Sequence, residues 1–362
     1  MVSVDDTLEV DDYDEFGLLH ENAAEWDQPY HQRPVVSRHY CEIEPERRLS
    51  YIRWGEAPPE IVFLHGGGQN AHTWDYVCLF LGRPALAVDL PGHGRSYRRP
   101  DRNYSPWENV VALEKALPSI APAATAVVGM SLGGATTIHL AAKRPDLCPR
   151  AVIIDVTPAV NNADRQMTTI ERGTVGLIGA QPVYDSFEEM ADAAIALSPY
   201  RAASGVRRGV RHNAYRTADG KWTWRYDLFG GRADQAPSSK ATQAPSSKAT
   251  QQTSSQATQQ TSSQATAPAT QQRNWADFTS LWEDVSSIVV PTMLVRGGES
   301  RYVLDEDGAE FQRRLPSLRY EMVAGAGHAV QSDQPLQLVA LLNDFLATTS
   351  PSTTTTKTTT PI

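Results

Sequence analysis

Residues 125–134 have the sequence TAVVGMSLGG, an apolar, β-branched run that passes through a glycine-rich turn into a segment of helical periodicity. Within it, Gly129-Met130-Ser131-Leu132-Gly133 fits the pattern G-x-S-x-G, in which a strained strand-to-helix turn lifts a serine hydroxyl out of a sheet. The glycines allow so sharp a turn to form. The pentapeptide also occurs by chance, so its place between a predicted strand and a predicted helix is what makes Ser131 the candidate nucleophile.

Outward from this turn, short runs of apolar and β-branched residues alternate with segments of helical periodicity. Continuous apolar strands that alternate with helices are typical of a largely parallel sheet covered on both faces, so we predict an α/β fold. The expected strands are residues 49–54, 60–64, 85–89, 125–129, 151–155, 292–295 and 319–323. The expected helices are residues 73–81, 107–117, 132–143, 305–314 and 335–346.

A second glycine-rich turn follows an earlier strand, where residues 63–68 have the sequence FLHGGG. An oxyanion hole in this architecture uses the backbone N–H after the nucleophile, here that of Leu132, and one N–H from such a loop. We choose Gly67 as the second donor, with Gly68 as the alternative. A phosphate-binding loop is excluded because no G-K-[S/T] follows the glycines.

The candidate general base is His328. The base should come last in the chain, on a loop after the final strand, and Gly325-Ala326-Gly327-His328 follows the strand predicted at residues 319–323. Nine histidines are scattered through the chain, and His328 alone combines a terminal strand, a glycine approach and a following helix. We therefore expect His328 to take the proton of Ser131.

The chain divides into a core, an insertion and two terminal segments. We expect an acidic, loosely held arm at residues 1–34, the hydrolytic core in two parts at residues 35–157 and 288–347, and a helical cap at residues 158–287. Four eight-residue units without large apolar residues begin at Ala236, and such units cannot build a solenoid core. We therefore predict a disordered insert at residues 233–273 and a Thr-rich disordered tail at residues 348–362.

The acid of a catalytic triad can follow the strand before the cap or the strand after it. The earlier strand, AVIID, ends on Asp155, whose carboxylate leaves the sheet at the C-terminal edge where ligands bind. After the later strand, Ser300 stands where an aspartate is expected, and Asp305 and Asp307 belong to a stretch that has the pattern of an acidic first turn of a helix. We prefer Asp155 and keep Asp305 and Asp307 as alternatives.

Arginines and aromatic residues are concentrated in the predicted cap, and Arg225 stands between Trp224 and Tyr226. One interpretation is a site for a carboxylate-bearing substrate, with Arg225 as a possible substrate-binding residue. The other is a solvated helix face.

Bulk composition narrows the class of partner. Lys and Arg total 33 against 42 Asp and Glu, a formal net charge of −9, and such a surface repels nucleic acid. The three cysteines lack metal-binding or disulfide spacing, and the N-terminus lacks a basic and apolar leader, so we expect no metal, no other cofactor and a cytoplasmic location. The nearly uncharged stretch between Lys115 and Lys143 contains prolines and glycines, which favours a buried strand, turn and helix over a membrane span.

Five blocks together resemble the α/β-hydrolase superfamily, namely HGGG at residues 65–68, DLPGHGRS at 89–96, GMSLG at 129–133, IDVTP at 154–158 and GAGH at 325–328. The fourth block is similar to small bacterial serine esterases whose acid follows the strand before the cap, which supports Asp155. The resemblance implies a mostly parallel eight-stranded sheet with helices on both faces, an inserted helical cap, cofactor-free chemistry and acyl substrates. It also implies structural roles for Asp89 and His93, and a serine at the elbow argues against the dehalogenases and epoxide hydrolases, which carry aspartate there.

These observations predict a metal-independent serine hydrolase that cleaves a carboxylic ester or related acyl bond of a small molecule through an acyl-enzyme. Two alternatives stay open. The same scaffold supports hydrolytic carbon–carbon cleavage of a diketone-like substrate, and a non-catalytic protein could keep the pocket and bind a small molecule. The acyl chain length and the oligomeric state do not follow from the sequence.

Overall fold

The computed structural model describes residues 13–160, 167–172, 177, 183–227 and 277–347. The predicted disordered insert at residues 233–273 and the Thr-rich tail at residues 348–362 lie outside the described residues, as does the start of the predicted arm.

An eight-stranded sheet forms the centre of the core, in the order β1-β2-β4-β3-β5-β6-β10-β11. Strand β2 runs antiparallel to both of its neighbours, and the other adjacent pairs run parallel. This confirms the mostly parallel sheet and the seven predicted strands. The strands are β1 (Val36–Glu44), β2 (Arg47–Trp54), β3 (Ile61–Leu64), β4 (Ala85–Val88), β5 (Ala126–Met130), β6 (Ala151–Ile154), β10 (Thr292–Gly297) and β11 (Arg319–Val323).

Strand β1 is the one member of this sheet that the sequence analysis does not predict. It lies at the edge of the sheet and pairs only with β2, with Val36 opposite Trp54. None of its residues is fully buried, and Tyr40 is 40% exposed. A solvated edge strand shows no continuous apolar run, which is the signal by which the inner strands were predicted.

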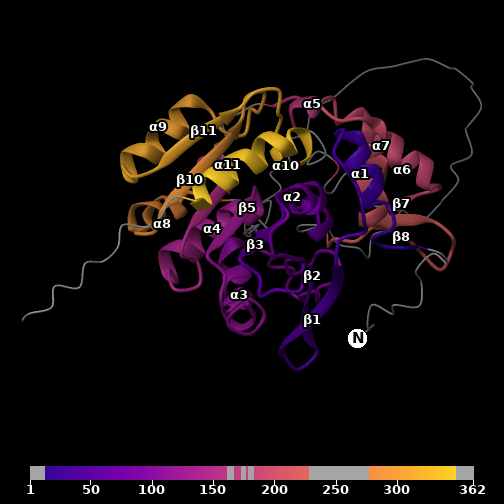
Figure 1. Cartoon of the computed structure of the whole chain (residues 1–362), viewed down its shortest axis with the longest axis horizontal. Helices are drawn as coiled ribbons and strands as arrows, with labels where there is room; N and C mark the ends of the chain where they lie inside the picture. The colour runs from indigo at the N-terminus through magenta and orange to yellow at the C-terminus, as the bar shows by residue number, and fades with distance from the viewer. Residues whose placement is uncertain (1–12, 161–166, 173–176, 178–182, 228–276, 348–362) are drawn as a thin grey trace, which may run out of the picture. The chain divides into compact units, whose positions relative to one another are not determined.

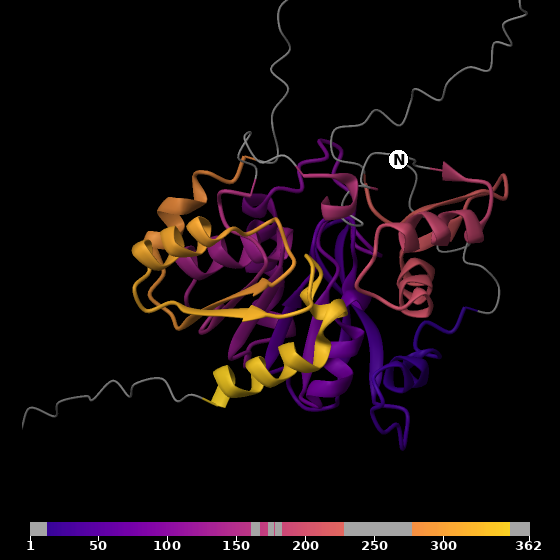
Figure 2. The ribbon, with the colours of Figure 1, turned by 90° about the horizontal axis from the view of Figure 1, so that it is seen from above.

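Helices cover both faces of the sheet because successive residues of a strand point to opposite sides. On β3, Val62 and Leu64 share a core with helices α3, α4, α8 and α9, whereas Ile61 and Phe63 share a core with α2, α10 and α11. Figure 2 shows α11 (yellow) and the orange helices on opposite sides of the sheet. These helices are α2 (Asp75–Leu81), α3 (Pro106–Ile120), α4 (Leu132–Lys143), α8 (Leu281–Ser287), α9 (Asp305–Arg314), α10 (Val330–Asp333) and α11 (Pro335–Ala347).

The cap is not purely helical, which corrects the prediction. It contains α5 (Thr169–Arg172), α6 (Phe187–Ala196) and α7 (Ala203–Asn213), together with a three-stranded antiparallel sheet of β7 (Val183–Tyr184), β9 (Trp222–Trp224) and β8 (Ala214–Arg216). Aromatic and β-branched residues such as those of β9 favour strands. These elements enclose a small apolar core of their own, and Figure 1 shows them gathered beside the main sheet.

The boundary of the cap also differs from the prediction. Helix α8 falls within the predicted cap at residues 158–287, yet its Leu281 and Val285 are fully buried in the same core as Phe311 of α9. Helix α8 therefore belongs to the layer of helices that covers the main sheet.

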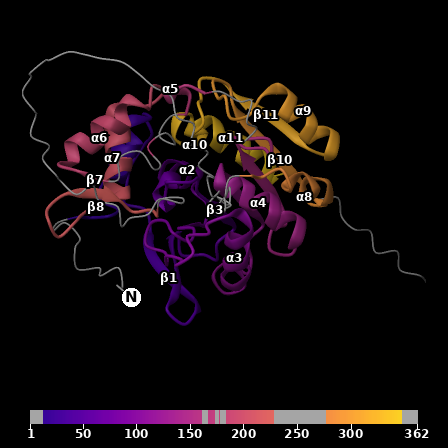
Figure 3. The same cartoon turned by 180° about the vertical axis from the view of Figure 1, so that it is seen from behind.

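The predicted arm contains a docked helix, α1 (Leu19–Glu25). Leu19 is buried in the core beneath α2, and Asn22 and Glu25 bind Arg208 of α7. Figures 1 and 3 show α1 (indigo) beside α7. Residues 13–25 therefore do not form a loosely held arm, because Leu19 and Ala23 are buried and Asn22 and Glu25 are bonded to the cap.

Candidate active site

Ser131 lies in the turn between strand β5 and helix α4, as predicted. Its backbone has φ 51° and ψ −114°, a combination that residues with side chains rarely adopt and that marks a strained turn. The flanking glycines are required, because a Cβ on Gly129 would overlap the carbonyl of Gly133, and a Cβ on Gly133 would overlap the carbonyl of Leu64. The close packing of helix against strands that the glycines permit presents the serine hydroxyl at the C-terminal edge of the sheet.

The structure brings Ser131, His328 and Asp155 together. His328 Nε2 lies 3.1 Å from Ser131 Oγ, and His328 Nδ1 lies 2.7 Å from Asp155 Oδ2. The His328 side chain is 8% exposed and the Asp155 side chain is fully buried. A hydroxyl, a base within hydrogen-bond reach and a carboxylate that orients the base form the arrangement that activates a serine.

The position of Asp155 follows from where β6 ends. The chain turns away from the sheet at this residue, which has φ 50°. The Oδ1 atom accepts a hydrogen bond from Gly297 N at 3.0 Å, and Oδ2 accepts one from the Ser300 hydroxyl as well as facing His328. Donors from two sides hold the carboxylate in the orientation that His328 needs.

The alternative acids make other contacts. The Asp305 side chain is 93% exposed and forms an ion pair with Arg296. Asp307 accepts a hydrogen bond from Leu304 N at 2.7 Å, at the start of α9. Both carboxylates therefore serve the first turn of a helix, where negative charge is favourable.

Two contributors to the site are missing from the sequence prediction. Ser300 bonds to Asp155 and also accepts a hydrogen bond from Tyr302 N at 3.1 Å. The Tyr302 ring stacks on the His328 ring, with 3.7 Å between the ring centroids and 20° between the planes. The signal for Ser300 was its place after the later strand, where an aspartate was expected, whereas Tyr302 carried no signal in the sequence.

The loop after β3 distinguishes between the two candidate oxyanion donors. Gly68 N donates a hydrogen bond to His93 Nε2 at 3.1 Å. No described residue accepts a hydrogen bond from Gly67 N, nor from the N–H of Leu132 at the start of α4. The N–H groups of Gly67 and Leu132 are thus available to a ligand, and that of Gly68 is engaged.

The turn after β4 holds this loop in place. Asp89 is buried and accepts a hydrogen bond from Arg95 N at 3.1 Å. Burial and the neighbouring His65 lower the pKa of His93 to about 3, so the ring stays neutral and its Nε2 can accept from Gly68 N. These contacts confirm the structural roles expected of Asp89 and His93.

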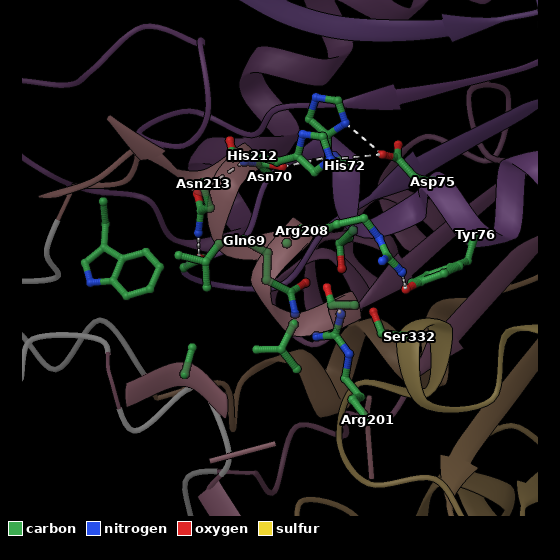
Figure 4. Close-up of a pocket in the computed structure, with 18 of the residues that line it drawn as sticks. Gln69, Asn70, His72, Asp75, Tyr76, Arg201, Arg208, His212, Asn213 and Ser332 are labelled. Atoms are coloured by element: carbon green, nitrogen blue, oxygen red, sulfur yellow. Dashed lines mark hydrogen bonds and ion pairs between the residues drawn. The ribbon is translucent and has the colours of Figure 1, made fainter. Parts of the chain in front are cut away.

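Two hollows adjoin at the site. The active-site pocket, of about 660 Å³ with its open mouth, is lined by His328 and residues around it. The cap cavity, of about 860 Å³ with its open mouth, is lined by Gly67 and by residues of α7 such as Val206, and Figure 4 shows it. Gln69 and Arg201 line both hollows.

Arg225 is not among the residues that line either hollow. Its guanidinium carbon lies 5.6 Å from the centre of the Tyr215 ring, and its Nε donates a hydrogen bond to Ala214 O at 3.1 Å. The predicted substrate-binding role therefore lacks support, because these contacts are within the cap itself. Arg201, from the same arginine-rich region, is the residue that the structure places at the site.

One group of described residues could hold a metal ion, since ligand atoms of His72, Asp75 and His212 lie within 4.8 Å of one another. These atoms already have partners: His72 Nδ1 lies 2.8 Å from Asp75 Oδ2, and Nε2 lies 2.9 Å from Glu15 Oε1. Burial lowers the pKa of His72, but the two carboxylates outweigh it and raise the pKa to about 9. Both ring nitrogens then carry protons at neutral pH, which suits an ion pair better than metal ligation.

Comparisons with known proteins identify the family of this chain. The model of the alpha/beta hydrolase family matches residues 61–341. Esterase Rv0045c of Mycobacterium tuberculosis is 41% identical over 338 residues, which are 92% of this chain and 96% of that protein. The sn-1-specific diacylglycerol lipase ABHD11 of Mus musculus is 26% identical over 294 residues, 80% of this chain and 81% of the lipase.

Solved structures point the same way. The crystal structure of esterase Rv0045c superposes with a TM-score of 0.72 at 39% identity, covering 94% of this chain and all of that one. E-2-(acetamidomethylene)succinate hydrolase has a TM-score of 0.63 at 18% identity over 86% of this chain, a likeness of fold alone. No helix among the described residues is long and apolar enough to cross a membrane. The fold, the family match and the esterase relative together show that the chain belongs to the alpha/beta hydrolase family and hydrolyses esters.

Proposed function

We propose that this enzyme is a metal-independent serine esterase that cleaves a small carboxylic ester through an acyl-enzyme, with Ser131 as nucleophile, His328 as general base and Asp155 as the acid. The observation that carries the proposal is the continuous chain of contacts from Ser131 Oγ through His328 to Asp155, at 3.1 and 2.7 Å. The relative named as an esterase supports ester hydrolysis in general.

In the first half-reaction, His328 Nε2 takes the Ser131 proton as Oγ attacks the substrate carbonyl carbon. The carbonyl oxygen becomes an oxyanion, which the N–H groups of Gly67 and Leu132 stabilise. The carbon–oxygen bond to the alcohol then breaks, the alcohol leaves with the proton from His328, and the acyl group stays on Ser131.

In the second half-reaction, water replaces the alcohol. His328 takes a proton from the water molecule, the hydroxide attacks the acyl carbon, and the same two N–H groups bind the oxyanion. Collapse returns the proton to Ser131 and releases the carboxylic acid. Asp155 keeps Nδ1 of His328 protonated and Nε2 free to accept, and it stabilises the imidazolium that forms in each step.

The surroundings of the triad fit these roles. The stacked Tyr302 ring limits rotation of the His328 ring. The thiols of Cys41, Cys78 and Cys148 are unpaired, which fits a reducing compartment, so the proposal includes a cytoplasmic location.

The experiment that tests the proposal measures hydrolysis of p-nitrophenyl esters from acetate to octanoate, with and without EDTA. We expect turnover that EDTA does not reduce and that Ser131→Ala lowers by about 10⁵-fold or more. A fluorophosphonate probe should label the wild type on Ser131 and leave the variant unlabelled.

Other results would overturn the proposal. Loss of activity in EDTA that added metal restores would contradict a metal-independent mechanism. A folded protein that cleaves a vinylogous diketone but no ester would be a carbon–carbon hydrolase, and one that turns over neither substrate would be a binding protein.

A further inference from the structure

We propose that Arg201 forms an anion-binding subsite beside the triad, so that the preferred substrate is an ester whose acyl chain carries a second carboxylate. The inference rests on the proposed esterase function and names its substrate class.

Arg201 stands where the two hollows meet. It lies in the cap between α6 and α7 and lines both the active-site pocket, which contains His328, and the cap cavity, which contains Gly67. Figure 4 shows its side chain pointing toward Gln69 and into the cavity. A substrate bound between His328 and Gly67 would therefore lie next to this guanidinium.

Arg201 has fewer charged partners among the described residues than Arg208 has. Its Nη2 donates to Gly205 O at 3.3 Å, and no described carboxylate forms an ion pair with it. Arg208, which lines the same cavity, is by contrast bonded to Asn22, Glu21 and Glu25. A half-buried guanidinium with donors to spare attracts a carboxylate ligand, which it can bind through two N–H groups at once.

The carboxylates in the active-site pocket form no ion pair with Arg201, although Asp333 attracts its charge from a distance. Glu171 accepts hydrogen bonds from the backbone and hydroxyl of Thr168 at 2.8 and 2.9 Å. Asp333 accepts from Gly327 N at 2.9 Å, and burial raises its pKa to about 6 although the Arg201 charge acts in the opposite direction. Glu299 is exposed at the rim. Arg201 thus keeps N–H groups to which no described carboxylate is bonded.

The arrangement of the two hollows assigns the second carboxylate to the acyl side. Gly67, the proposed oxyanion donor, lines the cap cavity, so a carbonyl bound there would extend its acyl chain into that cavity. The buried side chains of Val206 and Val210 offer apolar contacts to methylene groups along the way. His328, which must protonate the leaving alcohol, lines the active-site pocket instead.

The test compares two methyl esters of equal acyl length, monomethyl adipate and methyl hexanoate, by proton release at constant pH. We expect the wild type to prefer monomethyl adipate. Arg201→Ala should lose about 10- to 100-fold in kcat/KM on monomethyl adipate, mainly through KM, and change less than about twofold on methyl hexanoate. Arg201→Lys should keep part of the preference, because it keeps the charge without the planar fork.

Arg207→Ala is the matched control. Arg207 lies on α7, is 43% exposed and pairs loosely with Glu188 and Asp192 at 3.9 and 3.6 Å, and it lines neither hollow. It should leave both substrates unaffected. Carboxymethyl hexanoate, which carries its charge on the alcohol side, tests the assignment to the acyl chain, since a larger loss in Arg201→Ala on this ester would place the carboxylate on the alcohol.

The outcomes separate the subsite from the esterase proposal. Equal losses on both methyl esters, or no loss on either, would overturn the subsite and leave the esterase intact. If the wild type hydrolyses no ester, the esterase proposal fails, and the subsite is then decided by calorimetric binding of adipate to the wild type. Adipate binding that Arg201→Ala abolishes would support the subsite, and the absence of adipate binding would overturn it.

Discussion

Two clusters of this molecule contain the same types of side chain and do different things. The catalytic cluster, so named for its proposed role, is Ser131, His328 and Asp155. The arm cluster consists of Tyr13, Glu15, His72, Asp75 and His212. Each contains histidine paired with buried carboxylate, and in each a histidine ring stacks on another ring, at 3.7 Å between centroids for His328 and 3.9 Å for His72 with His212.

The difference lies in what the second ring nitrogen meets. His328 has a carboxylate at Nδ1 and a hydroxyl at Nε2, at 2.7 and 3.1 Å. His72 has carboxylates at both nitrogens, those of Asp75 and Glu15, at 2.8 and 2.9 Å. Two carboxylates hold a proton on each nitrogen, so His72 is a fixed cation, whereas His328 keeps one nitrogen free to accept a proton from a serine. A histidine–carboxylate pair is therefore a general base only when its other side faces a nucleophile.

The arm cluster instead joins three parts of the chain. Tyr13 and Glu15 come from the arm, His72 and Asp75 from the segment that enters α2, and His212 from cap helix α7. Figure 4 shows His72, Asp75 and His212 together at the edge of the cap cavity. We infer that these contacts hold the cap against the core.

The largest expected effect tests which carboxylate serves His328. Asp155→Asn should lower kcat about 10⁴-fold, because an amide stabilises the wrong tautomer of the imidazole and cannot balance the imidazolium. Asp305→Asn, at an exposed helix start, should change kcat less than about twofold. The measurement is kcat of both variants with a p-nitrophenyl ester. A larger loss in Asp305→Asn than in Asp155→Asn would place the acid after the later strand.

The next effect should appear in stability and not in catalysis. Glu15→Gln removes a half-buried partner of His72 and Arg38, which keep Asp75 and Asp89. Losing a hydrogen bond to a charged group costs about 1.5–3 kcal/mol in the free energy of unfolding. Once folded, the variant should keep kcat within about threefold of the wild type. Urea unfolding of Glu15→Gln beside Glu42→Gln, an exposed control on β1, measures it, and equal midpoints would show that the arm cluster does not stabilise the fold.

The pH dependence of stability should separate the two clusters further. The folded-state pKa of His72, about 9, lies above its ordinary value of 6.5, so the stabilisation from this proton is complete below pH 6.5 and is lost as the pH rises toward 9. Between pH 7 and 8.5 the free energy of unfolding should fall by about 1 kcal/mol per unit from this group alone. His72→Gln should lack that part of the slope, and an equal slope in both proteins would assign it elsewhere.

That Ser131 and His328 lie together could be predicted from the sequence, because the signals for both residues are local. The elbow at residues 129–133 is a strand, a turn and a helix in one short stretch, and His328 follows the last strand within a few residues. For the acid, the sequence favours Asp155 without excluding the alternatives. Asp155 and His328 are 173 positions apart, and no local pattern says which strand end faces the histidine. Ser300 shows the same limit, since its bond to Asp155 joins two loops that meet only in the folded sheet.

The arm cluster could not be predicted, because each of its bonds is long-range. Glu15 and His72 are 57 positions apart, and Tyr13 and His212 are 199 apart. The acidic N-terminal composition alone indicates a solvated tail. The structure contradicts that interpretation because acidic side chains of the arm pair with cations on other elements. The composition does not say where those cations lie.

A smaller effect tests how firmly Asp155 is held. Ser300→Ala removes one donor to the carboxylate and leaves Gly297 N and His328 in place. One hydrogen bond to a charged group is worth about 1.5 kcal/mol, so kcat should fall about 10-fold while KM stays the same. An unchanged kcat would mean that Gly297 and His328 suffice to orient the Asp155 carboxylate.

The smallest expected effect concerns Arg225, whose partners, like those of His72, belong to the protein. Its guanidinium lies over Tyr215 and bonds to Ala214 O, so Arg225→Ala should change KM less than about twofold for every acidic ester, with at most a modest loss of stability from the lost packing. KM values for monomethyl adipate in Arg225→Ala and Arg201→Ala make the comparison direct. A rise in KM for Arg225→Ala alone would mean that the Arg225 side chain leaves Tyr215 when substrate binds. Arg225 would then bind substrate although its guanidinium is bonded within the protein in this structure.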